Sequence, residues 1–418
     1  MSPAEARPLR LFVIAGEPSG DALGGALLAG MHEVAQRDIQ VTGVGGDRMA
    51  AQGLVSRFPM RELSVMGVAE ILPRLPDLLR RIRETADAVV AERPDALITI
   101  DSPDFCLRVA KRARKEIADL RVIHYVAPTV WAWRPGRATK MAKVVDHVLA
   151  LFPFEPPYME AAGMSCDFVG HPIASLQVPS AAEVAALRAE MGVREDQRLL
   201  AVLPGSRMGE VRRIAPVFAG ALERLQAEHS DLAVVVPAAV PVAEAVAAAF
   251  PPGAAGWPRM LDPRGVSPAE AEARKRALFA ASDVALAASG TVSLELASTG
   301  TPMVIGYSAS RLTEALVRRL ALVDTATMVN LITGTRVVPE YLFEAFTADN
   351  LASAVAELLG DQAAQDVQRD AGMRAMEMLG RGGDPPGLRA ARSVLDALGR
   401  ERPSISGSAR LQRFSTST

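Results

Sequence analysis

The stretch that decides the fold is LFVIAGEPSGD at residues 11–21. Leu11–Ala15 is a continuous apolar run, typical of a buried strand, and it ends in a loop that contains two glycines and a proline. The next segment, residues 21–34, is rich in small residues that are compatible with a helix. We therefore predict a strand, a glycine-containing loop and a helix here.

The same pattern recurs in two series along the chain. The apolar runs of the first series are Ile39–Val44, Ala96–Ile100, Val122–Val126 and His147–Leu151, and those of the second are Leu199–Leu203, Leu232–Val236, Val284–Ala287 and Met303–Ile305. Stretches compatible with helices separate several of these runs. Alternating strands and helices predict parallel sheets covered by helices on both faces.

A chain of 418 residues exceeds what one ordinary hydrophobic core supports, so two domains are expected. An irregular stretch near Pro172–Ala181 separates the two series of strands. We predict an α/β fold with two doubly wound, Rossmann-like domains facing a central cleft. The ranges are 8–175 and 176–345 for these domains, 346–401 for C-terminal helices that pack back on the first domain, and 402–418 for a disordered tail.

The composition excludes several classes of protein. No apolar run approaches the roughly 20 residues that span a bilayer, and the run at 11–16 is too short for a signal-peptide core, so we expect a cytoplasmic protein. A net charge of −2 gives no global attraction to nucleic acid. The two cysteines form no CxxC pair, which argues against a disulfide framework or a cysteine zinc site.

A phosphate site is predicted where Ser289, Gly290 and Thr291 follow an apolar strand and begin a helix. Backbone N–H groups at a helix start can hold a phosphate, and Glu295, one turn further on, can accept hydrogen bonds from vicinal ribose hydroxyls. The alternative is a serine N-cap with a capping-box glutamate.

Arg207 follows another strand in LPGSR and can bind two phosphate oxygens, although it could instead be a solvated surface arginine. Together these residues predict a nucleotide-diphosphate site.

The first domain supplies a candidate general base. Asp101 follows the apolar run 96–100, so it is expected at the carboxyl end of a strand, where ligands bind in α/β sheets. A carboxylate there can take the proton of an acceptor hydroxyl. Asp101 could equally be a turn former, and Asp104 a helix cap.

The loop at 15–21 is neither a G-x-G-x-x-G fingerprint nor a P-loop, which argues against a dehydrogenase or a kinase. Glu17, Ser19, Gly20 and Asp21 are candidates for contact with the acceptor or the sugar. The alternative is a tight turn between a strand and a helix.

An amphiphilic stretch at 63–83 combines apolar residues with Arg74, Arg80, Arg81 and Arg83. Such a surface suits the interface of an anionic membrane and could admit acyl chains. The alternative is a helix with an apolar core face and a basic solvent face. The candidates for membrane or acyl-chain contact are Val65, Met66, Val68, Ile71, Leu72 and Leu75.

Taken in order, these motifs resemble the lipid-A-disaccharide synthase family. The matching segments are AGEPSGD at 15–21, GVGGDRM at 43–49, MGVAEIL at 66–72, IDSPDF at 100–105, YVAPTVWAWRPGR at 125–137, FVGHP at 168–172, LPGSR at 203–207, SGTVSLE at 289–295 and the region 330–340. The resemblance implies a fold of the GT-B type, in which Asp101 is the general base and Arg207 and Glu295 bind UDP. It also implies that Asn330 and Glu340 are further donor-cleft positions.

The resemblance implies transfer of a sugar from UDP-2,3-diacylglucosamine to 2,3-diacylglucosamine 1-phosphate, with inversion. The products would be UDP and the β-1,6-linked disaccharide 1-phosphate of lipid A, in the lipopolysaccharide of Gram-negative bacteria. The first domain would then bind the acceptor and the second the UDP-sugar. Association with the inner-membrane surface is implied, without a metal or other cofactor; a homodimer is one assembly compatible with the sequence. The rival interpretations are a UDP-sugar 2-epimerase of the same architecture and a non-enzymatic ligand-binding regulator.

Overall fold

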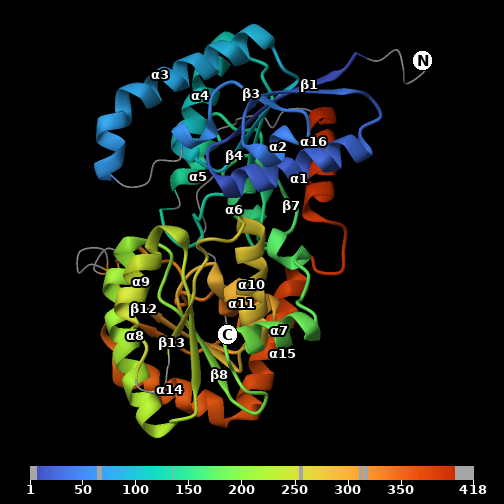
Figure 1. The fold of residues 1–418 in the computed structure, drawn as a ribbon. Coiled ribbons are helices and arrows are strands. Elements are labelled where there is room, and N and C mark those ends of the chain that lie inside the picture. The colour runs from blue at the N-terminus through green and yellow to red at the C-terminus, as the bar shows by residue number, and fades with distance from the viewer. Residues whose placement is uncertain are drawn as a thin grey trace. The chain divides into compact units, whose positions relative to one another are not determined.

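The computed structural model describes residues 7–63, 68–134, 136–253, 258–309, 314 and 319–400. The chain divides into two compact units. The first contains the described residues up to Ser175 together with those from Gly382 onward, and the second spans Leu176–Arg381. Each unit is an α/β structure built on a parallel sheet (Figure 1).

The strands of the first unit, within the described residues, form one parallel sheet in the order β3-β2-β1-β4-β5-β6-β7. Their bounds are β1 (Leu9–Ala15), β2 (Ile39–Val44), β3 (Val55–Ser56), β4 (Ala96–Ile100), β5 (Val122–Tyr125), β6 (His147–Ala150) and β7 (Ser165–Phe168). The helices are α1 (Pro18–Val34), α2 (Asp47–Ala50), α3 (Val68–Glu92), α4 (Pro103–Glu116), α5 (Gly136–Met141), α6 (Pro156–Glu160) and α16 (Pro386–Gly399), with short 3₁₀ turns at Met60–Glu62 and Pro172–Ser175.

Both faces of this sheet are buried, which explains why its strands are continuous apolar runs. In β1, Phe12 and Ile14 belong to a core that includes Val89 of α3 and Val109 of α4. The alternate residues of β1 belong to a second core that includes α1 and α16. A sheet between two helical layers is the doubly wound arrangement that the sequence predicts.

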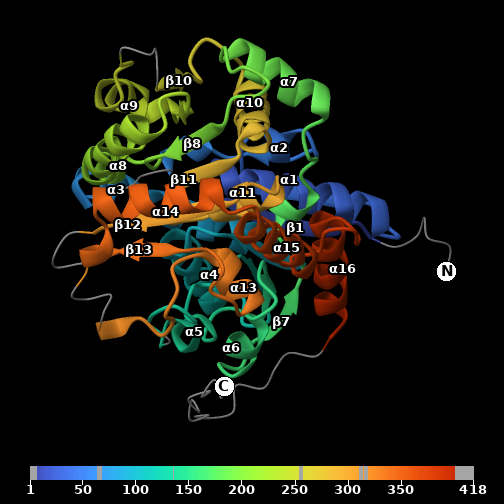
Figure 2. The same cartoon turned by 90° about the horizontal axis from the view of Figure 1, so that it is seen from below.

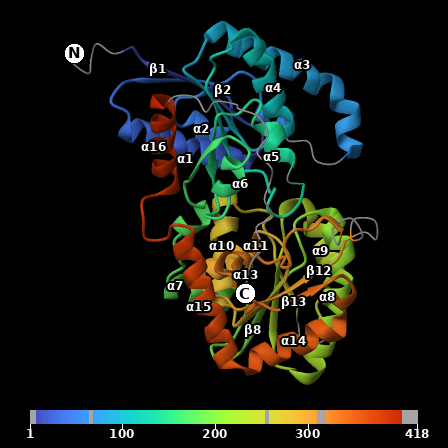
Figure 3. The ribbon, with the colours of Figure 1, turned by 180° about the vertical axis from the view of Figure 1, so that it is seen from behind.

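Helix α16 packs against α1 at a point where both helices carry glycine (Figure 3). A Cβ atom on Gly30 would lie 2.6 Å from the carbonyl oxygen of Gly387, and one on Gly387 would lie 2.4 Å from that of Ala26. Ser393 of α16 adds a polar contact, since its hydroxyl lies 2.8 Å from Nε2 of His147. Glycine is therefore required for the close approach of these two helices.

The second unit has the strand order β10-β9-β8-β11-β12-β13, again parallel throughout the described residues. The strands are β8 (Leu199–Leu203), β9 (Ala233–Pro237), β10 (Arg259–Leu261), β11 (Val284–Ala288), β12 (Met303–Tyr307) and β13 (Glu340–Leu342). The helices are α7 (Ala181–Glu190), α8 (Met208–Glu228), α9 (Ala243–Ala249), α10 (Pro268–Ala281), α11 (Val292–Ser298), α13 (Met328–Thr333), α14 (Ala348–Gly360) and α15 (Gln362–Met378), with 3₁₀ turns at Val240–Val242 and Phe343–Ala345.

Helices α8, α9 and α14 share one core with the sheet of the second unit, and Figure 2 shows α14 lying along β11 and β12. The remaining helices, α7, α10, α11, α13 and α15, contact one another in a separate layer. The segment 346–401 is thus divided between the units. Helices α14 and α15 pack within the second unit and only α16 joins the first, which corrects the expectation that the whole segment returns to the first domain.

The order of strands reverses direction once in each sheet, between β1 and β4 in the first unit and between β8 and β11 in the second. At such a switch point the two following loops leave the carboxyl edge in opposite directions, and a crevice forms between them. The loops concerned begin at Gly16 and Asp101 in the first unit and at Pro204 and Ser289 in the second.

Replacing Gly387 by alanine tests the contact between α1 and α16. Alanine favours a helix by about 1 kcal/mol over glycine, so an isolated α16 would gain from the change. Overpacking against Ala26 should instead lower the free energy of unfolding by about 1–3 kcal/mol, measured by urea or thermal denaturation. Gly399→Ala is the control, because a Cβ atom at that helical position meets nothing within 4 Å. Equal stability of the two variants would contradict the required close approach.

Candidate functional site

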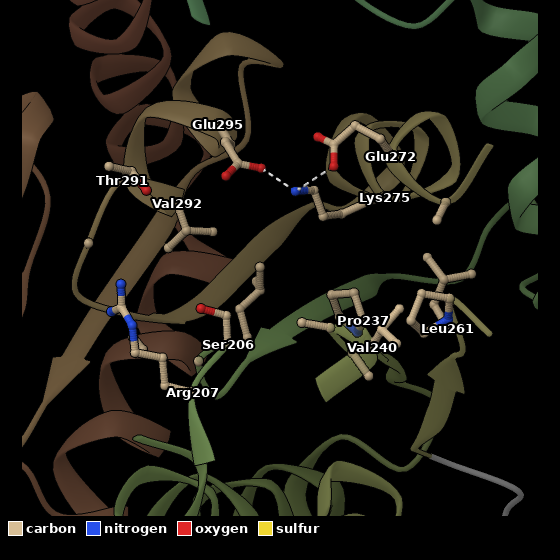
Figure 4. A pocket seen from close by; sticks show the side chains of 18 of the residues that line it. Ser206, Arg207, Pro237, Val240, Leu261, Glu272, Lys275, Thr291, Val292 and Glu295 are labelled. Atoms are coloured by element: carbon tan, nitrogen blue, oxygen red, sulfur yellow. Dashed lines mark ion pairs between the residues drawn. The ribbon is translucent and has the colours of Figure 1, made fainter. Parts of the chain in front are cut away.

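A pocket of about 600 Å³ lies at the switch point of the second unit. This volume is within the range of small-molecule sites, which are about 300–1,000 Å³. The loops after β8 and β11 form part of its wall, together with the segments after β9 and β10 and the first turns of α10 and α11 (Figure 4). Arg207, Ser289, Gly290, Thr291 and Glu295 all line it. The structure therefore brings together five residues that the sequence predicts to bind a nucleotide diphosphate.

Glu295 lies in α11 and is paired with a cation on another helix. Nζ of Lys275, in α10, lies 2.7 Å from Oε2 of Glu295 and 3.0 Å from Oε2 of Glu272 (Figure 4). Burial lowers the pKa of Lys275, but the two carboxylates outweigh burial, so its pKa lies above the ordinary value. The pocket thus contains a row of alternating charges, acidic, basic and acidic.

The loop that carries Arg207 is shaped by a glycine and by the first turn of α8. Gly205 has a φ of +111°, in the region that favours glycine. Glu210 accepts a hydrogen bond from the backbone N–H of Ser206 at 3.2 Å and pairs with the Arg207 guanidinium at 2.9 Å. The side chain of Arg207 nevertheless stays 66% exposed, which leaves guanidinium N–H groups available to a ligand in the pocket.

The turn at 289–291 is held in place through Ser289, whose hydroxyl donates to the carbonyl oxygen of Ala326 at 2.8 Å. In the part of the chain that the structure describes, the backbone N–H groups of Gly290 and Thr291 donate to no backbone carbonyl. Both residues are exposed and line the pocket. Two N–H groups next to each other are suited to an anionic oxygen.

One wall of the pocket is apolar. Pro237, Val240 and Leu261, with Ala238 and Ala239 between them, line the side that follows β9 and β10 (Figure 4). The polar groups described above come from the loops after β8 and β11 and from α10 and α11. The pocket therefore offers an apolar surface suited to a flat ring beside a carboxylate, an arginine and free N–H groups.

Asn330 and Glu340 do not line this pocket, and their polar atoms are already used. Asn330 is fully buried; its amide donates to the carbonyl oxygen of Val338 at 2.9 Å and accepts from the N–H of Val338 at 3.1 Å. Glu340 accepts from the N–H groups of Ala326 at 3.0 Å and Thr327 at 2.9 Å. These side chains hold the loop on which Ser289 rests, and contact of Asn330 and Glu340 with the donor stays a prediction.

Asp101 follows β4 in the first unit, at the switch point beside β1. Its φ is +50° and that of Ser102 is +44°, so two consecutive non-glycine residues are left-handed. The N–H of Asp101 donates to the carbonyl oxygen of Tyr125 at 3.0 Å, and the side chain is half-buried. Left-handed conformations of this kind cost of order 1–3 kcal/mol each and are concentrated at functional sites.

The loop after β1 lies against the same turn. A Cβ atom on Gly16 would lie 2.5 Å from Oγ of Ser102, so a larger residue there would require Ser102 to shift. Glu17 precedes α1 and is half-buried, and Ser19 is exposed, so both are available to a ligand.

Gly20 and Asp21 have structural roles in the described residues. Gly20 is buried against Ala15 and Ile100. Asp21 accepts from the backbone N–H groups of Gly46, Arg48 and Met49 at 2.8–3.1 Å and so caps α2. Its buried carboxylate holds α2 against α1, and contact of Gly20 and Asp21 with the substrate stays a prediction.

The predicted membrane stretch is described only in part. Val65 and Met66 lie outside the described residues, and of Val68, Ile71 and Leu72 only the helical backbone of α3 is described. Leu75 is 41% exposed and Leu79 is 42% exposed, so α3 presents apolar side chains to solvent. Arg80 and Arg81 are engaged in ion pairs with Glu84. No helix in the described part of the chain is long and apolar enough to cross a bilayer.

Sequence reasoning missed two charged residues. Lys275 lies within a helix and has no motif around it; its importance is visible only from its contact with Glu295. Glu155 is buried in the first unit, where it accepts from Nε1 of Trp131 at 3.3 Å and from the N–H groups of Leu151 and Phe152 at 3.0 Å. Trp131 packs edge-on against Phe154, with 5.1 Å between ring centroids, which assigns this tryptophan to packing.

The two parallel sheets, each with a switch point at its carboxyl edge, define a two-domain α/β protein of the GT-B type. The fold is similar to that of the UDP-GlcNAc 2-epimerase from Neisseria meningitidis, solved bound to UDP-GlcNAc, with a TM-score of 0.58 over 93% of this chain and 98% of that chain. At 11% sequence identity this likeness concerns the fold alone.

Sequence comparison assigns the family. The family model described as Lipid-A-disaccharide synthetase matches residues 11–382. The chain is 60% identical over 94% of its length to the lipid-A-disaccharide synthase of Ruegeria pomeroyi, covering 96% of that protein. It is 47% identical to the synthase of Rhodospirillum centenum, covering 94% of this chain and 95% of that one. The chain therefore belongs to the lipid-A-disaccharide synthase family and is a glycosyltransferase of lipid A biosynthesis, which favours the synthase over the epimerase interpretation.

Glu155 should make the stability of the first unit depend on pH. Burial raises the pKa of this carboxyl to about 7 from an ordinary value of 4.5, against the opposing effect of its hydrogen bonds. A carboxyl with a raised pKa binds its proton more tightly in the folded state, so its contribution is greatest below pH 4.5 and is lost as pH rises through about 7.

The measurement is the melting temperature of wild type and Glu155→Gln between pH 5 and 8. Wild type should lose stability relative to the variant by on the order of 3 kcal/mol across this range, at about 1.4 kcal/mol for each unit of pKa. A stability difference that does not change with pH would contradict the raised pKa.

Proposed function

We propose that the protein transfers 2,3-diacylglucosamine from its UDP derivative to 2,3-diacylglucosamine 1-phosphate, giving the β-1,6-linked disaccharide 1-phosphate and UDP. The observation that carries this proposal is the pocket of the second unit, where Arg207, Gly290, Thr291 and Glu295 line one cavity. The names of the related synthases support a disaccharide of lipid A as the product.

The donor nucleotide is assigned to this pocket by chemical complementarity. The diphosphate binds the Arg207 guanidinium and the N–H groups of Gly290 and Thr291, because charge-assisted bonds to phosphate oxygens are the strongest available there. The ribose hydroxyls donate to Glu295, and the base packs on the apolar wall formed by Pro237, Val240 and Leu261. UDP is then a stabilised leaving group.

Asp101 is assigned as the general base. Its carboxylate takes the proton of the acceptor hydroxyl while that oxygen forms a bond to the anomeric carbon of the donor. The bond from that carbon to the diphosphate breaks in the same step, and its electron pair leaves with UDP. A single displacement inverts the anomeric centre, and the residues assigned here act without a metal or other cofactor.

Glu17 and Ser19 are proposed to contact the acceptor from the loop after β1. The exposed Leu75 and its neighbours on α3 are proposed to contact the inner-membrane surface or the acyl chains, because both substrates carry acyl chains and α3 exposes apolar and basic side chains. Association is peripheral in this proposal, from the cytoplasmic side.

The activity is tested by supplying both diacylated substrates in detergent micelles and measuring UDP release with the anomeric configuration of the product. A β-linked disaccharide and equimolar UDP are expected. Incubation with UDP-GlcNAc alone is the control for a 2-epimerase, and an epimer formed there without any acceptor would overturn the proposal. Ligand-induced stabilisation without UDP release would indicate a binding protein instead.

Asp101→Asn should lower kcat by about 10²–10⁴-fold, the usual contribution of a general base. Asparagine tolerates the left-handed backbone at this position as well as aspartate does, so the change removes the charge without adding strain. UDP affinity should stay within about twofold of wild type because Asp101 contacts the acceptor. Asp104→Asn, at an exposed position in the first turn of α4, is the control and should keep its turnover. Near-normal kcat in Asp101→Asn would reject its role.

Arg207→Gln should weaken UDP binding by about 10- to 100-fold, since a hydrogen bond between charged groups is worth about 1.5–3 kcal/mol. Uridine, which carries no phosphate, should bind the variant and wild type alike in calorimetric titration. Arg212→Gln is the matched control, because Arg212 is exposed on α8, the helix that follows Arg207, and does not line the pocket. Loss of uridine affinity in Arg207→Gln would show that the arginine supports the pocket rather than the phosphates.

A further inference from the structure

Lys275 is the charged group that contacts the carboxylate assigned to the ribose. It belongs to α10, and its ammonium lies between Glu295 of α11 at 2.7 Å and Glu272 of its own helix at 3.0 Å (Figure 4). Its side chain is 30% exposed and that of Glu295 is 24% exposed, so the pair lies at the wall of the pocket rather than in bulk solvent. A half-buried ion pair is screened less than a surface pair.

The contact with Lys275 involves one of the two carboxylate oxygens of Glu295. Oε2 is buried, with the ammonium of Lys275 beside it, and Glu295 lines the pocket. A carboxylate that accepts from a vicinal diol must hold a fixed orientation, because both donors are fixed to one ribose ring. The lysine supplies such an anchor from a second helix, α10 (Figure 4).

The other charged residues that line the pocket lie around the pair of Lys275 and Glu295. Glu272 contacts the far side of the ammonium, while Arg207 with Glu210 on the loop after β8, Asp262 after β10, and Arg274 of α10 complete the charged lining. Arg207 is paired with Glu210, and Arg274 with Glu190. Among the charged residues that line the pocket, Lys275 is therefore the cation whose partner is Glu295.

We propose that Lys275 is a positioning residue, which orients Glu295 and stabilises its negative charge for the ribose hydroxyls of the donor, and which does not contact the phosphates. This inference rests on the proposed placement of UDP. It predicts that loss of Lys275 weakens recognition of the ribose hydroxyls selectively, because the lysine acts through Glu295.

The test is calorimetric titration with UDP and with 2′-deoxyuridine diphosphate. Wild type should prefer UDP by about 10-fold or more, as expected for a hydrogen bond to a charged acceptor. Lys275→Met should reduce this preference to below about threefold, as should Glu295→Gln, and the double variant should lose no more than either single variant. Lys275→Gln serves as a second neutral variant, and thermal unfolding shows which variants fold.

Two conservative changes serve as controls. Lys275→Arg keeps a cation at the same place and should restore the preference for UDP. Glu272→Gln removes the other partner of the lysine and should keep the preference within about twofold of wild type, since Glu295 still has its anchor. If Lys275→Arg loses the preference for UDP to the same extent as Lys275→Met, the lysine merely fills space.

The outcomes distinguish a failure of the role of Lys275 from a failure of the proposed UDP site. If Lys275→Met weakens UDP and its 2′-deoxy analogue equally, the lysine acts on the phosphates, and the positioning role is overturned while the site stands. The role is also overturned if Glu295→Gln loses the preference and Lys275→Met keeps it. If wild type itself does not distinguish the two ligands, the placement of ribose at Glu295 fails, and the role of Lys275 fails with it.

Discussion

β8 and β11 run parallel and side by side, with Leu203 opposite Ala287, and the proposed nucleotide site depends on this pairing. The chain leaves these two strands in opposite directions, so Arg207 and the turn at 289–291 reach the same crevice although 82–84 residues separate them. Neither segment forms a site alone. The crevice is a consequence of the strand order, as in other doubly wound sheets, and the side chains in it decide which ligand binds.

The first unit uses the same geometry with a different chemistry. Its switch point carries Asp101 on a left-handed turn that contacts Gly16 of the neighbouring loop, where a larger residue would require Ser102 to shift. The strain is compatible with folding because the surrounding core is buried on both faces of the sheet. Likeness to a 2-epimerase at 11% identity reflects this shared framework, whereas 60% identity to a synthase reflects the residues placed on it.

The long central strands and the residues that follow them could be predicted from the sequence, because strands buried on both faces are continuous apolar runs. The edge strands β7, β10 and β13 could not be, since they are short and carry polar residues such as Asp167, Arg259 and Glu340. Asn330 and Glu340 have polar side chains near a strand, and sequence alone does not show the hydrogen bonds that they make with the chain itself. Lys275 needed the packing of α10 on α11 to be recognised.

Hydrogen–deuterium exchange with and without UDP tests most directly the claim that the switch point of the second unit binds the donor nucleotide. Saturating UDP should slow exchange in peptides covering 204–210 and 289–295, including the N–H groups of Gly290 and Thr291 that donate to no backbone carbonyl in the described structure. Peptides from β1 and α1 should exchange unchanged. Protection confined to the first unit, with none at 289–295, would contradict the account.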